Sequence, residues 1–241
     1  MILLPVAAIG EDHVTVAVAS NFAATAREVA GQFSQESGLD VRITTASSGK
    51  LFAQIVNGAP FDILLAADAE RPQRLEAAGA GVPGTRFTYA LGALVLWSRQ
   101  VDDCREALRS ADGGRIAIAN PETAPYGAAA VSYLRRSGLW ESVSDRLVIG
   151  ENIAQTLQFA ASGNARLGFI ARSQLQAPSL PQASCTWLVP ETMYSAIDQQ
   201  AILLRRGAGA EGAKSFLEFL RGDTGRAIIL RHGYGLPEVK E

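Results

Sequence analysis

Three segments of the sequence place uncharged hydrogen-bonding side chains where an expected strand runs into an expected helix. They are Ser20 and Asn21 in VAVASNFAAT, Ser48 in ITTASSGKLF and Tyr126 in NPETAPYG. Because Ser and Asn are preferred N-cap residues, any one junction taken alone could serve only to cap its helix. Together they indicate more, since helix N-termini at the carboxyl ends of parallel strands direct free N–H groups into one crevice. We therefore expect an anion-binding site there.

The first two junctions carry no positive charge, because no Lys or Arg occurs in residues 14–26 or 43–49. An anion bound there would be held by neutral dipoles, which avoids the desolvation cost of a buried ion pair. Hydrogen bonds to a charged ligand contribute about 1.5–3 kcal/mol each. After the costs of association and closure, several such bonds would leave roughly −8 to −10 kcal/mol, enough for a micromolar-to-nanomolar site.

The hydrophobic pattern predicts the strands and helices that position these junctions. Residues 13–19 alternate and are β-branched, whereas apolar residues recur at helical spacing in 23–37. The nearly continuous apolar stretch 59–67 is typical of a parallel strand covered on both faces. By the same criteria we expect strands at 38–47, 87–98, 114–121, 145–150, 165–171 and 198–206, and helices at 48–58, 125–140, 153–164 and, on either side of Gly222, within 210–234.

This order of elements predicts two α/β lobes in a chain of 241 residues, 48% of them hydrophobic and 19% charged. Terminal helices that cover the first lobe would make it discontinuous in sequence. We expect lobe I to comprise 12–88 and 198–241, and lobe II to comprise 89–197. The apolar stretch at the start is too short to span a bilayer, so we interpret residues 1–11 as a signal remnant or a disordered N-terminus.

Charge and cysteine content argue against several functions. The formal net charge is −2, the pI is about 5.8 and like charges form no runs, which disfavours nucleic acid or anionic lipid as a partner. Cys104 and Cys185 fit no metal spacing, and both a disulfide between them and two free buried thiols remain open. His13 and His232 lie at opposite ends of the chain without a nucleophile motif, which disfavours a hydrolase triad.

Four motifs resemble those of the periplasmic molybdate-binding proteins, the ModA family, which deliver oxyanions to an ABC transporter. They are ASNFAAT, ASSGKLFAQIVNGAPFDILLAAD, NPETAPYG and LGFIA, in the family's order and spacing, and the resemblance runs from about residue 13 to 237. The second motif is the most specific, because generic α/β composition does not explain it. The resemblance implies a type II periplasmic-binding-protein fold, in which each lobe is a mixed sheet flanked by helices and a tetrahedral oxyanion lies in the interlobe cleft.

The resemblance also implies a set of oxyanion ligands. They are Ser20, Asn21, Ser48, Tyr126 and Ile153. Ile153, at the start of the helix in GENIAQTL, would contribute only its backbone N–H. Many family members have a ligand tyrosine just after the LG-[FIV]-[IV] strand, where this chain has Ala171, and we expect Tyr126 to supply the missing hydroxyl. No catalytic residue, cofactor or direct metal ligand is expected, since the metal arrives as an oxyanion.

The implied function is capture of molybdate, and of tungstate, by a monomeric periplasmic protein that passes the anion to a membrane permease. We expect a freely soluble form, because the sequence shows no lipobox Cys. Closure would bend the chain near 87–91 and 196–199. Asp62 and Asp68 flank the third strand, but a carboxylate would repel a dianion, so we assign them to caps or interlobe ion pairs.

A site made only of hydrogen-bond donors would distinguish anions that carry a proton from anions that do not. It leaves the proton of hydrogenphosphate unpaired, whereas molybdate, tungstate and sulfate are fully deprotonated near neutral pH. Cavity size alone would then separate these three anions. Two alternatives therefore remain: a binding protein for sulfate, a metal complex or a small organic anion, and, less favoured, an enzyme on the same architecture. The enzyme would need a general base or nucleophile in the cleft, where the sequence offers only hydroxyls.

Overall fold

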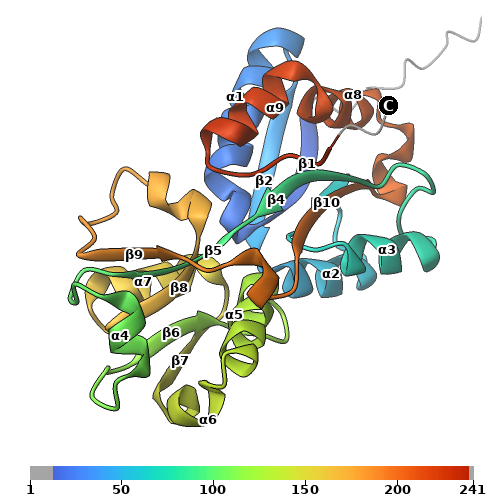
Figure 1. Cartoon of the computed structure of the whole chain (residues 1–241). Coiled ribbons are helices and arrows are strands. Elements are labelled where there is room, and N and C mark those ends of the chain that lie inside the picture. Colours follow the sequence, from blue (N-terminus) through green and yellow to red (C-terminus); the bar gives the residue numbers. More distant parts are fainter. Residues whose placement is uncertain (1–12, 239–241) are drawn as a thin grey trace, which may run out of the picture.

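The computed structural model describes residues 13–238, whose strands form two five-stranded sheets (Figure 1). The first sheet has the order β2(Asp40–Ala46), β1(His13–Ala19), β3(Ile63–Leu65), β10(Ile197–Leu203), β4(Phe87–Gly92). The second has the order β7(Leu147–Gly150), β6(Ile116–Ala119), β8(Leu167–Ala171), β5(Leu94–Ser98), β9(Cys185–Leu188). The expectation for residues 1–11 lies outside the described residues.

Both sheets are mixed and follow the same pattern. In the first, β1 is parallel to β2 and β3, while β10 is antiparallel to β3 and β4. In the second, β6 is parallel to β7 and β8, while β5 is antiparallel to β8 and β9. Three parallel strands therefore end at one edge of each sheet, and the segments that follow them begin at that edge.

Helices cover both faces of the first sheet. They are α1(Ala23–Ser37), α8(Glu211–Arg221) and α9(Asp223–Arg231) on one face, and α2(Ser48–Val56) and α3(Glu70–Ala77) on the other (Figure 1). Val16 and Val18 of β1 join the hydrophobic cluster on the α1 side, whereas Ala17 between them joins the cluster on the α2 side. This alternation follows from the two-residue period of a strand. We call this sheet with its five helices lobe I.

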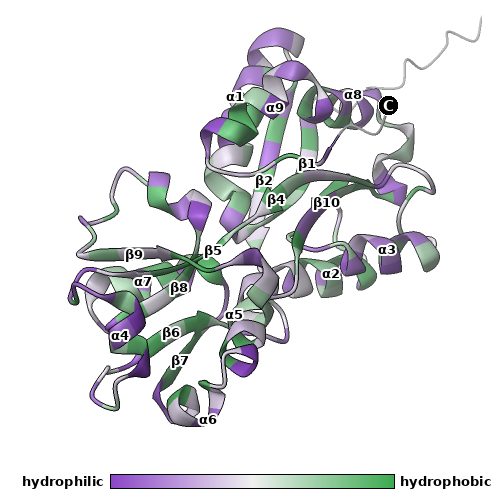
Figure 2. Ribbon diagram, in the orientation of Figure 1, coloured by the Kyte–Doolittle hydropathy of each residue, from purple (hydrophilic) through white to green (hydrophobic). Residues whose placement is uncertain are grey.

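The second sheet is covered in the same way. Its helices are α4(Cys104–Arg109), α5(Pro125–Arg136), α6(Trp140–Val143) and α7(Ile153–Ser162). Leu94 and Leu96 of β5 pack in the cluster that holds α5, and Val95 and Trp97 pack in the cluster that holds Ala160 of α7. Figure 2 shows its strands as predominantly hydrophobic. We call this sheet with its helices lobe II. No helix within residues 13–238 has the length and hydrophobicity needed to cross a membrane.

The expectation of a single long strand at 87–98 is wrong in one respect. The structure divides it at Ala93 into β4, which belongs to the first sheet, and β5, which belongs to the second. The division lies where the chain passes from one lobe to the other. Gly92 is required there, since a Cβ at this position would overlap the Tyr126 hydroxyl and lie 2.8 Å from Ile197 Cγ2.

The two cysteines form a disulfide. Cys104 at the start of α4 is bonded to Cys185 at the start of β9, with the two Cα atoms 5.7 Å apart and 81 positions between them in sequence. This result decides between the alternatives that the sequence left open. The bond fastens a short helix to the edge strand of lobe II, and neither of these elements gave a periodic signal in the sequence.

Candidate anion-binding site

The four junctions meet at the boundary between the lobes. Ala19, which directly precedes Ser20, and Ala67, whose N–H donates to Ser48 Oγ at 2.9 Å, both belong to lobe I. They nevertheless pack in one buried cluster with Tyr126 and Ile153 of lobe II. Helix α7 also contacts the 3-10 helix at Ser20–Phe22. The structure therefore brings together all five residues expected at the site, which are Ser20, Asn21, Ser48, Tyr126 and Ile153.

At the first junction, the side chain of Asn21 is already occupied by protein partners. Its Nδ2 donates to Gln199 Oε1 at 2.7 Å and to the Tyr234 hydroxyl at 3.1 Å. Its carbonyl oxygen accepts from the Tyr234 hydroxyl at 2.8 Å and from Ser173 Oγ of lobe II at 3.4 Å. Asn21 can therefore offer a ligand its backbone N–H, with Ser20 half-buried beside it.

At the second junction, capping and binding are assigned to different serines. Ser47 is the N-cap of α2, and its Oγ accepts from the N–H of Lys50 at 3.4 Å. Ser48 is 1% exposed and accepts one hydrogen bond, from Ala67 N–H. The hydroxyl proton of Ser48 is therefore available to a further acceptor. The capping explanation accounts for Ser47 and leaves Ser48 unexplained.

The third junction holds a buried hydroxyl without a partner. Tyr126, in the first turn of α5, is 1% exposed, and its hydroxyl has no hydrogen-bond partner among the described residues. Leaving such a group unpaired costs about 1–3 kcal/mol. Burial raises the pKa of Tyr126 well above the ordinary value of a tyrosine, so the hydroxyl stays protonated and can donate its proton to an incoming acceptor.

At the fourth junction, the side chain that caps the helix accepts no hydrogen bond from the Ile153 N–H. Asn152 is the N-cap of α7, and its Oδ1 accepts from the N–H groups of Ala154 at 2.9 Å and Gln155 at 3.2 Å. Ile153 itself is buried, and Gln174 Nε2 donates to its carbonyl oxygen at 2.9 Å. Gln174 Oε1 also accepts from Ala171 N–H, which ties the end of β8 to this junction.

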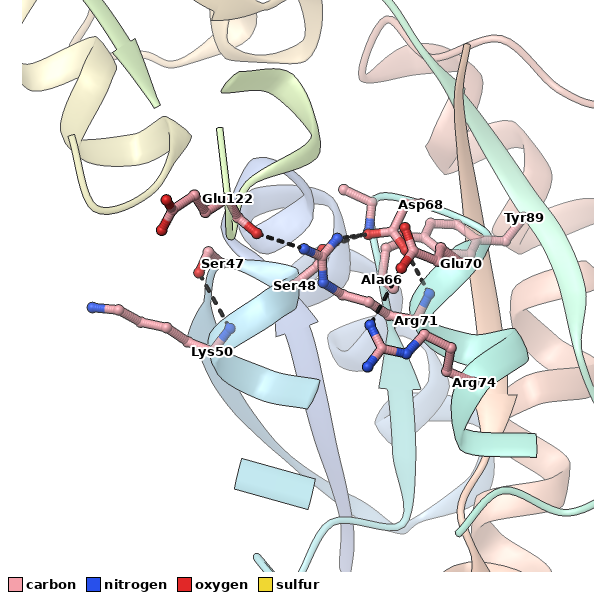
Figure 3. A network of polar contacts seen from close by, with 11 residues as sticks. Ser47, Ser48, Lys50, Ala66, Asp68, Glu70, Arg71, Arg74, Tyr89 and Glu122 are labelled. Carbon is pink, nitrogen blue, oxygen red and sulfur yellow. Dashed lines mark hydrogen bonds and ion pairs between the residues drawn. The ribbon is translucent and has the colours of Figure 1, made fainter. Parts of the chain in front are cut away.

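An ion pair, a side-chain hydrogen bond and a backbone hydrogen bond connect the lobes around these junctions. The N–H of Gly49 donates to the Thr123 carbonyl at 2.8 Å. Arg71 Nη2 donates to the Glu122 carbonyl at 3.0 Å, while its Nη1 pairs with Asp68 at 2.7 Å (Figure 3). Lys50 Nζ lies 2.9 Å from Glu151 Oε2. The two lobes are therefore in contact at the edge of the site.

The two aspartates have different structural roles. Asp68 accepts from Arg71 N–H at the start of α3 and holds the Arg71 side chain toward lobe II, so it acts both as a cap and in interlobe contact. Asp62 is buried inside lobe I, where it pairs with Arg206 and accepts from Thr15 N–H and Oγ1, both at 2.7 Å. Within residues 13–238, no group of three or more His, Cys, Asp or Glu is placed to hold a metal ion.

Three buried tyrosines near the lobe boundary make stability fall at alkaline pH. Burial raises the pKa of Tyr234 to about 12, and it raises the pKa of Tyr89 and Tyr126 well above the ordinary value. Above pH 10 the unfolded chain loses phenolic protons that the folded chain keeps, so the free energy of unfolding should fall by about 1 kcal/mol per pH unit for each buried tyrosine. Urea unfolding at pH 9 to 12 measures this slope. Tyr234→Phe should make this slope smaller by the contribution of one tyrosine. An unchanged slope would contradict the raised pKa of Tyr234.

The fold and this pattern of donors define the class of protein. Residues 14–235 match the model of the bacterial extracellular solute-binding protein family. The molybdate-binding protein ModA of Azotobacter vinelandii is 43% identical over 227 residues, covering 93% of this chain and 90% of that one. ModA of Rhodobacter capsulatus is 42% identical over 234 residues, covering 96% and 90%. The chain belongs to this solute-binding family, in the group of the ModA proteins.

Solved structures agree with this assignment. The periplasmic molybdate-binding protein of Azotobacter vinelandii superimposes with a TM-score of 0.88 at 38% identity, covering 93% of this chain and all of that one. The sulfate-binding protein SubI of Mycobacterium tuberculosis has a TM-score of 0.77 at 13% identity, which shows the shared fold alone. The expected periplasmic-binding-protein fold is thus confirmed, and these relatives are binding proteins rather than enzymes.

Proposed function

We propose that this chain binds molybdate, and also tungstate, between its lobes and delivers the anion to an ABC permease. It acts in the periplasm as a monomer, and lobe I and lobe II move relative to each other as two bodies. The ligands are Ser20, Asn21, Ser48, Tyr126 and Ile153. The observation that carries the proposal is the Tyr126 hydroxyl, which is buried, protonated and without an acceptor in residues 13–238. The names of the close relatives support molybdate as the ligand.

The chemistry of the donors suits a fully deprotonated oxyanion. Ser48 and Tyr126 offer hydroxyl protons, and Ile153 offers a backbone N–H at the N-terminus of α7, where the helix dipole favours negative charge. None of the five ligand residues is charged. A protonated anion such as hydrogenphosphate would find no acceptor among these donors, so its proton would remain unpaired.

Closure of the lobes completes the site. Ser20, Asn21 and Ser48 come from lobe I, whereas Tyr126 and Ile153 come from lobe II. An anion that contacts both sets stabilises the closed form by its differential affinity for that form. The bending segments are those near 87–91 and 196–199, where β4 and β10 lead from one sheet toward the other. The closed form then presents both lobes to the permease.

Isothermal titration calorimetry tests this function. The dialysed protein is titrated near neutral pH and at fixed salt with molybdate, tungstate, sulfate and phosphate. We expect submicromolar Kd values for molybdate and tungstate and no measurable heat for the other two. Tight sulfate binding would instead identify a sulfate-binding protein. No heat with any of the four would contradict the proposal.

The exposed ion pair across the cleft should contribute little. Lys50 and Glu151 are 46% and 66% exposed in their side chains. Surface pairs of this kind contribute about 0.2–1 kcal/mol and are screened by salt. Lys50→Ala should therefore weaken molybdate binding less than about fivefold at low salt, with no difference at high salt. Titrations at two salt concentrations measure this, and a large loss that persists at high salt would show that Lys50 contacts the anion.

A further inference from the structure

Gln199 lies in β10, one of the strands that lead from lobe to lobe, and its side chain is completely buried. Its Oε1 accepts from Asn21 Nδ2 at 2.7 Å. The Tyr89 hydroxyl lies 3.2 Å from both this oxygen and the Ala66 carbonyl oxygen, and its one proton is shared between them. Gln199 Nε2 has no hydrogen-bond partner among the described residues. The buried amide is therefore satisfied on one side only, which calls for an acceptor on the other.

The orientation of this amide follows from its neighbours. The one proton of the Tyr234 hydroxyl goes to the Asn21 carbonyl oxygen, which can only accept. The Tyr234 oxygen must then accept from the Asn21 side chain, so the Asn21 atom that faces it is the donor Nδ2. That same Nδ2 contacts Gln199, whose facing atom must accept and is therefore Oε1. Gln199 Nε2 is consequently the donor atom that is left without a hydrogen-bond partner among the described residues.

Gln199 Nε2 and the Tyr126 hydroxyl both lie close to Gly92. A Cβ built on Gly92 would lie 3.1 Å from Gln199 Nε2 and would overlap the Tyr126 hydroxyl, so both groups border the same small space. Each is a polar atom of a fully buried side chain that lacks a hydrogen-bond partner within the described chain. One comes from β10 and the other from α5 of lobe II, so this space lies where the lobes meet.

We propose that Gln199 is a positioning residue for Tyr126: with the anion bound, Gln199 Nε2 donates to the Tyr126 oxygen, directly or through one bridging water, and so directs the phenolic proton at the anion. The inference rests on the proposed function. The oxygen of Tyr126 accepts while its proton is donated, and hydrogen bonds arranged in this order strengthen one another. Because Gln199 Oε1 also accepts from the Asn21 side chain, the Gln199 amide aligns Asn21 of lobe I and Tyr126 of lobe II.

A double-mutant cycle tests this role. The four proteins are wild type, Gln199→Met, Tyr126→Phe and the double variant, with the molybdate Kd measured by calorimetry and thermal stability measured without ligand. We expect Gln199→Met to weaken binding about five- to tenfold in the wild-type background. In the Tyr126→Phe background its effect should be no more than about twofold. The loss of stability, which reflects the lost acceptor for Asn21, should be the same in both backgrounds. Gln200→Met, on the same strand, is the matched control.

Other outcomes overturn the inference. An equal loss of affinity in both backgrounds would mean that Gln199 acts independently of the Tyr126 hydroxyl, and no loss in either would mean that it has no role in binding. A wild-type chain that fails to bind molybdate contradicts the proposed function itself. If Gln199→Met does not fold, Gln199→Glu retains an acceptor for Asn21 and Tyr89, removes the donor and adds a negative charge. Its loss of affinity must then exceed that of Gln200→Glu, which adds the same charge one residue away.

Discussion

Replacing Gly49 by Ala is expected to weaken molybdate binding about 5- to 150-fold without unfolding the protein, because overpacking a close contact costs about 1–3 kcal/mol. A Cβ at Gly49 would lie 2.9 Å from Thr123 Cα, 3.0 Å from its carbonyl oxygen and 3.1 Å from its Cβ. Gly49 belongs to lobe I and Thr123 to lobe II, so the clash exists only when the lobes are closed. The variant therefore penalises the closed form selectively.

Two measurements separate this effect from general damage. The Kd for molybdate comes from calorimetry, and the radius of gyration at saturating ligand comes from small-angle X-ray scattering. Gly31→Ala is the matched control, since it also adds a methyl group to a helix, but no atom of another residue lies within 4 Å of that methyl group. The control should bind and close like the wild type. Wild-type affinity and full closure in Gly49→Ala would contradict the closed arrangement of the lobes.

Tyr126→Phe is expected to weaken molybdate binding about 10- to 150-fold, the effect of losing one hydrogen bond to a charged ligand worth about 1.5–3 kcal/mol. Without ligand, the variant should be as stable as the wild type or more stable, because the hydroxyl it removes has no partner in the part of the chain that the structure describes. A residue that only packs at the start of a helix would give neither result.

Tyr133→Phe provides the control for this substitution. Tyr133 is also buried in α5, and its ring packs against Phe169 and Trp187 of lobe II. Its hydroxyl should therefore have no influence on the anion. Calorimetry and thermal unfolding of both variants complete the comparison. Equal affinity for molybdate in the wild type and Tyr126→Phe would show that the hydroxyl does not contact the anion.

Much of the fold could be predicted from the sequence because its signals are local. The alternation in 13–19 and the helical spacing in 23–37 correspond to β1 and α1 with the same bounds. The positions of the junctions follow from the same patterns, since strands that run parallel end at one edge of their sheet. The structure accordingly brings Tyr126 and Ala67, the hydrogen-bond partner of Ser48, to one boundary between the lobes.

The remaining features depend on contacts between distant parts of the chain. Gln199 and Tyr234 reach Asn21 across 178 and 213 positions, and no spacing rule connects such residues. The sequence equally cannot show that Ser47 rather than Ser48 caps α2, because both are good caps and only the geometry separates them. The division of the strand at Ala93 has the same origin, since it depends on which sheet each half joins.

The most direct test of the proposed site is a crystal structure of the protein with molybdate, in which anomalous scattering locates the molybdenum. We expect one peak between the lobes, with oxygens of the anion about 2.7–3.2 Å from Ser48 Oγ, the Tyr126 hydroxyl and the Ile153 nitrogen, and no Lys or Arg in contact. A peak elsewhere, or an anion in contact with a cationic side chain, would contradict a site made of uncharged donors between the lobes.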